Sequence, residues 1–90
     1  MLMIHYYTRH GCHLCDVMLE ELMPLVRDRA EICIRDVDTN PEWLAKYDRR
    51  VPVIEVAGRT VSEYPLDHEA VRRCLAEKPE KNGEIGILRG

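Results

Sequence analysis

Two cysteines three residues apart, Cys12 and Cys15, are the residues of this chain best suited to chemistry. An extended apolar run from Leu2 to Tyr7 precedes them, and a pattern typical of an amphipathic helix follows. A thiol at the start of a helix lies at the positive end of the helix dipole, which favours the thiolate, the attacking form of cysteine. One helical turn also brings two sulfurs within disulfide reach. The pair therefore predicts thiol–disulfide chemistry.

The same pair allows other interpretations. Four cysteines placed at random produce this spacing in roughly one chain in eight, so the spacing alone is a modest signal. A zinc or iron–sulfur site would need two more ligands, for which His10 and His13 are the nearest side chains. The pair could also be chemically inactive on a binding module. Cys33, on a predicted buried strand, and Cys74, on a predicted helix core face, are interpreted as inert buried thiols.

Length and charge restrict the class of protein. The 90 residues predict one small domain, and the net charge of −3 gives no support for binding nucleic acid or an anionic membrane. No apolar segment approaches the ~18 residues that cross a bilayer, and the first residues lack the features of a signal peptide. We therefore expect a cytoplasmic monomer, in a compartment where structural disulfides are rare.

The helix that follows the cysteines is the element that must position them. The pattern predicts it from His13 to about 29–30, and Pro24 should bend it without dividing it. The residues expected to face the core are Leu14, Met18, Leu22, Leu25 and Val26.

Further strands and helices complete the domain. Strands are expected at 32–37, 51–56 and 59–63, the last two joined by a tight turn at Ala57-Gly58. One short helix should run from Pro41 to about Tyr47, with Asn40 as its N-cap.

The last helix is expected to begin after its N-cap, Asp67. Its buried stripe should consist of Val71, Cys74 and Leu75. The domain is then 1–79, and residues 80–90 form a frayed tail.

The order β-α-β-α-β-β-α, with CxxC after the first strand and Val51-Pro52 opening the third, resembles the thioredoxin fold in its minimal, glutaredoxin-like form. More narrowly, residues 7–16 and 50–53 resemble small bacterial glutaredoxin-like proteins. The resemblance covers residues 2–77 and implies an α/β fold, a four-stranded mixed sheet flanked by three helices. It also implies the sheet order second, first, third, fourth strand, with the third and fourth antiparallel to the first.

The resemblance implies roles for individual residues. Cys12 would be the nucleophile, and Cys15 the resolving thiol, which attacks a mixed disulfide. Pro52 would be cis and face the two sulfurs, and the backbone of Val51 would pair with an extended substrate.

Several charged side chains are supporting candidates by position. Cations that could favour the thiolate are Arg9, His10, His13 and Arg50. Arg50 could also attract a carboxylate of the substrate. Ordinary glutaredoxins hold glutathione with two glycines and an acid after the fourth strand, whereas here the glycines are absent, Glu63 adds a negative charge and only Asp67 could stand in for the acid. The usual mode of glutathione binding is therefore not expected. Glutathione is still a candidate co-substrate, and we expect no bound cofactor or metal.

These observations predict a thiol–disulfide oxidoreductase in cell redox homeostasis, with Cys12 and Cys15 as its redox-active centre. Its partner would be a disulfide-containing protein or a small thiol. The alternative is a thioredoxin-fold binding module whose CxxC holds a metal or cluster or does no chemistry.

Overall fold

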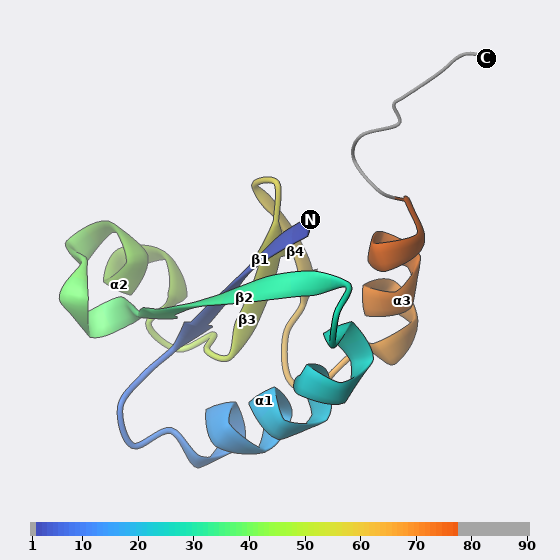
Figure 1. Ribbon diagram of the computed structural model, residues 1–90. Helices are drawn as coiled ribbons and strands as arrows, with labels where there is room; N and C mark the ends of the chain where they lie inside the picture. The colour runs from blue at the N-terminus through green and yellow to red at the C-terminus, as the bar shows by residue number, and fades with distance from the viewer. Residues whose placement is uncertain (1, 78–90) are drawn as a thin grey trace.

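The computed structural model describes residues 2–77 as a four-stranded mixed sheet with helices on both faces (Figure 1). Met1 and residues 78–90, which include the tail expected at 80–90, lie outside the described part. The elements are β1 (Leu2–Thr8), α1 (His13–Val26), β2 (Ala30–Asp36), the 3-10 turn η1 (Val37–Thr39), α2 (Pro41–Tyr47), β3 (Val53–Val56), β4 (Arg59–Ser62) and α3 (His68–Glu77). The predicted fold class and element order are confirmed.

The sheet has the order β2-β1-β3-β4, as expected. β1 and β2 are parallel, whereas β3 is antiparallel to β1, with Tyr7 opposite Val53. β4 is antiparallel to β3 and therefore runs in the direction of β1. The expectation that the fourth strand is antiparallel to the first is wrong, because the tight turn at Ala57-Gly58 reverses the chain once more. Both turn residues have a positive φ, 52° and 79°, as a two-residue hairpin turn requires.

The main core lies between one face of the sheet and the helices α1 and α3. Side chains of a strand alternate between the two faces, so every second residue of β1 and β3 enters this core. Its buried members are Ile4, Tyr6, Met18, Leu22, Val26, Ile54, Val56, Leu66, Val71 and Leu75.

The buried stripe of α1 differs from the predicted one at its start. Cys15 is buried, whereas Leu14 is 44% exposed, so the prediction of a core position for Leu14 is wrong. The reason is the helical period, since the buried positions begin at Cys15 and recur every three or four residues. Pro24 lies inside α1 without dividing it, and α1 ends at Val26, earlier than predicted, because Asp28 adopts a positive φ of 63°.

The opposite face of the sheet carries a smaller core against α2. It is formed by Tyr7, Val37, Tyr47 and Val53, with Trp43, Leu44 and Val51 partly buried beside them. No residue of β2, the edge strand of the sheet, belongs to this smaller core.

The two cysteines outside the CxxC are not the buried thiols that the sequence led us to expect. Cys33 and Cys74 are both only partly buried. For Cys33 the physical reason is the edge position of β2, none of whose residues is buried. Cys74 lies beside the buried stripe of α3, which consists of Val71 and Leu75.

Candidate functional site

The cysteine pair lies at the connection between β1 and α1. Gly11, with φ of 80°, turns the loop, and Cys12 is the N-cap of α1 in an extended conformation. Cys12 and Cys15 form a disulfide with a Cα–Cα distance of 5.2 Å. Cys12 is partly exposed, whereas Cys15 is only 1% exposed. Cys12 is therefore the more accessible of the two cysteines.

The first turn of α1 provides electrostatic support for the Cys12 sulfur. The backbone N–H of Cys15 donates to Cys12 Sγ over 3.1 Å. This amide is one of the donors at a helix start that have no partner within the helix. A thiolate at Cys12 Sγ would accept the same hydrogen bond. The positive end of the helix dipole would also stabilise its negative charge. His13 is the first residue of α1 and is exposed, as is His10 in the preceding loop.

A tyrosine that the sequence did not single out fastens this turn to the sheet. The hydroxyl of Tyr6, in β1, donates to the carbonyl oxygen of Cys15 over 2.7 Å, in a buried position. Burial, and after it the charge of Asp16, raises the pKa of Tyr6, so the hydroxyl remains a donor. An apolar run that contains tyrosine is the only signal of this contact in the sequence.

Register brings Val51 and Pro52 to the same end of the sheet as the cysteines. Tyr7 pairs with Val53 in antiparallel register, so the residues that follow Tyr7 and those that precede Val53 leave the sheet side by side. The peptide bond between Val51 and Pro52 is cis, Pro52 is buried and Val51 is partly exposed.

Arg9 does not stand free beside the cysteines. Its guanidinium binds Asp38 Oδ1 over 2.9 Å and Asp48 Oδ1 over 2.6 Å. The hydrogen bonds to Asp38, followed by its charge and the contacts with Asp48, raise the pKa of Arg9 in spite of some desolvation. Arg9 thus ties the loop before Cys12 to η1 and to the end of α2, with its charge balanced by two carboxylates.

The two candidate substrate-binding residues both have partners within the fold. Arg50 Nη2 lies 2.6 Å from Glu63 Oε2, and the Arg50 guanidinium stacks over the Tyr47 ring at 5.5 Å. Asp67 Oδ1 accepts a hydrogen bond from the N–H of Ala70 over 3.0 Å, which confirms Asp67 as the N-cap of α3.

A buried acid forms a network that sequence reasoning missed. Glu55 lies on β3 and accepts hydrogen bonds from the hydroxyls of Tyr47 (2.8 Å) and Tyr7 (3.1 Å). Burial alone would raise the pKa of Glu55, but these hydrogen bonds and the charges of Lys46 and His5 outweigh it, so the pKa is lowered. One signal was present in the sequence: Glu55 interrupts an apolar strand.

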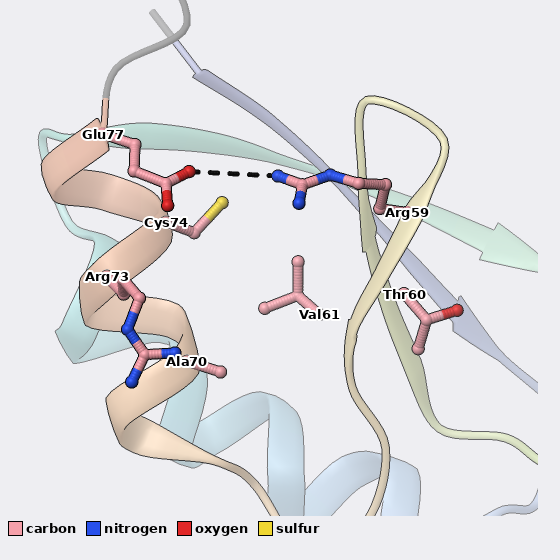
Figure 2. Close-up of a pocket in the computed structure, with 7 residues that line it drawn as sticks. All are labelled: Arg59, Thr60, Val61, Ala70, Arg73, Cys74 and Glu77. Atoms are coloured by element: carbon pink, nitrogen blue, oxygen red, sulfur yellow. Dashed lines mark ion pairs between the residues drawn. The ribbon is translucent and has the colours of Figure 1, made fainter.

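A shallow pocket of about 200 Å³ lies elsewhere, between β4 and α3 (Figure 2). None of the predicted site residues lines it. Its walls are Arg59, Thr60, Val61, Ala70, Arg73, Cys74 and Glu77. Arg59 and Glu77 face each other across it at 3.9 Å.

Two further observations concern metal ions and membranes. Within residues 2–77, no three His, Cys, Asp or Glu side chains gather in a way that could hold a metal ion. The same part of the chain contains no helix long and apolar enough to span a bilayer.

Comparisons with known proteins agree with this fold. An X-ray structure of the protein XcR50 from X. campestris is 30% identical, with a TM-score of 0.64, over 84% of this chain and 99% of that one. Thioredoxin 1 from Thermosipho africanus TCF52B is 20% identical, with a TM-score of 0.59, over 84% of this chain and 97% of that one, a likeness of fold. A malarial protein shares the fold at 16% identity and a TM-score of 0.59, over 87% of this chain and 96% of that one. No curated protein matches the chain.

The family itself follows from a match along most of the chain. The model of the glutaredoxin-like domain (DUF836) matches residues 3–76, which include the CxxC, Val51-Pro52 and the four strands of the sheet apart from Leu2. The chain belongs to this glutaredoxin-like family.

Proposed function

We propose that the protein is a thiol–disulfide oxidoreductase in which Cys12 is the nucleophile and Cys15 the resolving thiol. The observation that carries this proposal is the placement of Cys12 at the start of α1, partly exposed, disulfide-bonded to the buried Cys15 and hydrogen-bonded to its N–H. The unequal exposure of the two cysteines supports the order of attack.

The reaction begins with the reduced protein. The Cys12 thiolate attacks one sulfur of a substrate disulfide, which forms a mixed disulfide and releases the other substrate sulfur as a thiolate that takes up a proton. Deprotonated Cys15 then attacks Cys12 Sγ and releases the second substrate thiol. In total, two protein thiols are oxidised to the Cys12–Cys15 disulfide and one substrate disulfide is reduced to two thiols. An external thiol reductant restores the dithiol.

The substrate surface proposed here is the end of the sheet that carries the cysteines. Val51 is partly exposed there, two residues before the start of β3, and its backbone would pair with an extended segment of the substrate. A disulfide within an accessible, extended peptide of a protein is therefore the substrate class that fits this surface.

Glutathione is a less favoured co-substrate in this proposal. The Arg50 guanidinium, the candidate partner for a carboxylate, is already paired with Glu63 at 2.6 Å. Asp67 is engaged as the N-cap of α3. Glutathione could recycle the enzyme only if its carboxylates compete with these contacts.

Reduction of a protein disulfide by the purified, reduced protein tests the proposal. Cys12→Ser should abolish turnover, and Cys15→Ser should accumulate a covalent complex with the substrate, visible by mass spectrometry. Cys33→Ser and Cys74→Ser are matched controls that remove a thiol outside the pair and should keep the wild-type rate. Turnover by Cys12→Ser at the wild-type rate would exclude the mechanism.

Metal analysis of protein purified without oxygen separates the proposal from the metal-binding alternative. A redox dithiol should contain metal far below one equivalent. Stoichiometric zinc or iron that is lost in Cys12→Ser would instead favour the binding module.

A further inference from the structure

Within the described part of the chain, β2 forms an outer edge of the sheet. Among residues 2–77, β2 has a strand neighbour on one side only, the parallel strand β1. In Figure 1 β2 crosses in front of β1, with α2 beyond its end. An edge strand presents unpaired N–H and C=O groups and can pair with another chain.

The exposure of β2 fits an edge that is covered by a partner. None of its seven residues is buried, whereas all four residues of β3 are. Ile34 is 57% exposed, more than any other large apolar residue that the structure describes. β2 contains no proline and no lysine, and its register with β1 shows no bulge, so its backbone is free of two devices that usually block edge pairing.

The sequence of β2 is complementary to itself in the antiparallel direction. The strand is Ala-Glu-Ile-Cys-Ile-Arg-Asp, with Cys33 at its centre. Two copies aligned on Cys33 place Glu31 opposite Arg35 twice, once in each direction. The same alignment places Ile32 opposite Ile34, also twice. We propose that the chain forms a symmetric dimer in which β2 pairs antiparallel with β2 of a second copy, centred on Cys33.

The charges select this register over its neighbours. A shift of one residue would exchange the two faces of one strand. A shift of two residues keeps the faces but places Cys33 opposite either Glu31 or Arg35, so both opposite-charge pairs are lost. Facing opposite charges stabilise a strand pair and like charges destabilise it. Only the register centred on Cys33 pairs all seven residues and matches both charges.

The contacts of Arg35 within residues 2–77 of its own chain are with uncharged groups, so they leave its charge for a carboxylate of the second copy. Arg35 Nη1 donates to the Tyr7 hydroxyl over 2.7 Å, and its guanidinium lies 4.8 Å from the centre of the Trp43 ring. Arg35 is thus fixed on the α2 face of the sheet. Glu31 lies four residues before Arg35, so its side chain is on the same face of the sheet, and it is exposed. In the dimer each fixed Arg35 meets the exposed Glu31 of the other copy.

Cys33 supplies a reporter for the two-fold axis. Directly opposite residues of an antiparallel pair have Cα atoms about 4.5–5.5 Å apart. This lies within the Cα separation of about 4.4–6.8 Å found in disulfides. An added diazene oxidant such as diamide can therefore join the two thiols, taking up two electrons and two protons as the S–S bond forms.

Sedimentation of the reduced full chain at increasing concentration is the first test. The wild type should shift from monomer to dimer. Glu31→Arg places like charges opposite each other twice and should weaken association by about tenfold or more. The double variant Glu31→Arg with Arg35→Glu restores opposite charges and should recover most of the association. A wild type that stays monomeric up to millimolar concentration, or an unchanged Glu31→Arg, would overturn the proposal.

Crosslinking gives a second test that leaves Arg35 intact, because this residue also supports Tyr7 and Trp43. A variant with Cys12, Cys15 and Cys74 replaced by serine retains only Cys33 and should form a covalent dimer with diamide. The matched variant that retains only Cys74 should stay monomeric under the same conditions. Equal crosslinking of the two would contradict the register. The dimer does not depend on the redox chemistry at Cys12, and it departs from the monomer expected from the sequence.

Discussion

The hydroxyl of Tyr6 donates a buried hydrogen bond of 2.7 Å to the carbonyl oxygen of Cys15. This contact joins the middle of the sheet to the first turn of α1, the turn that carries both cysteines. It fixes Cys15, the buried partner of the disulfide, whose own N–H donates to Cys12 Sγ.

Tyr6→Phe should therefore lower the free energy of unfolding by about 0.5–1.5 kcal/mol, the usual net value of one hydrogen bond. The pKa of Tyr6 is raised from its ordinary value of 10.0, so the protonated form stabilises the fold below that pH. The advantage of the wild type over Tyr6→Phe should be constant up to about pH 10 and shrink above it. Urea unfolding at several pH values measures both effects. Tyr64→Phe, at an exposed tyrosine, is the control and should change little.

Glu55→Gln should remove a pH-dependent contribution to stability. The pKa of Glu55 is lowered from its ordinary value of 4.5, so its charged form stabilises the fold above that pH and the stabilisation is lost as the pH falls below it. At neutral pH we expect the variant to be less stable by about 1–3 kcal/mol, because two tyrosine hydroxyls lose a charged acceptor. Thermal unfolding from acid to neutral pH measures the difference.

The control for Glu55 is Glu20→Gln, at an exposed position of α1. That variant should follow the wild-type profile within experimental error. A Glu55→Gln profile parallel to that of the wild type at all pH values would show that the carboxylate charge does not stabilise the fold.

Alkylation should distinguish the thiols of the reduced protein. Burial, and after it the charge of Glu77, raises the pKa of Cys74, although the charge of Arg59 opposes this effect. Iodoacetamide at neutral pH should therefore modify Cys12 well before Cys74, as peptide mapping would show. Glu77→Gln should speed the modification of Cys74 by about twofold and leave Cys12 unchanged. Faster modification of Cys74 than of Cys12 in the wild type would contradict both the reactivity proposed for Cys12 and the raised pKa of Cys74.

Glu63→Gln should change the use of glutathione. In the wild type Glu63 neutralises Arg50, the candidate partner for a glutathione carboxylate. Freed from this pair, Arg50 should lower the KM for a glutathione mixed disulfide by about two- to fivefold, as is typical of exposed charges. Steady-state kinetics measure the effect, and the combined variant with Arg50→Ala should abolish it. An equal change in both variants would mean that Arg50 does not contact glutathione.

The sequence by itself determined the elements and the position of the chemistry. Local signals are enough for this: the helical period, the Asn40 and Asp67 caps and the turn at Ala57-Gly58 act through neighbours in the chain. The same signals placed Cys12 at a helix start, where its chemistry follows from backbone amides. The boundary of α1 was not determined locally: the helix ends at Val26, because the residues at 27–29 form a turn with a positive φ at Asp28.

Only the tertiary structure decided what surrounds the site, because these contacts join residues far apart in the chain. Arg9 has the right position in the sequence to support a thiolate, yet Asp48, 39 residues away, takes its charge. Glu55 is buried among tyrosines from β1 and α2, which no local pattern reveals. The edge position of Cys33 depends on the order of the strands, because side-chain alternation gives the face of a residue but not the neighbour of its strand.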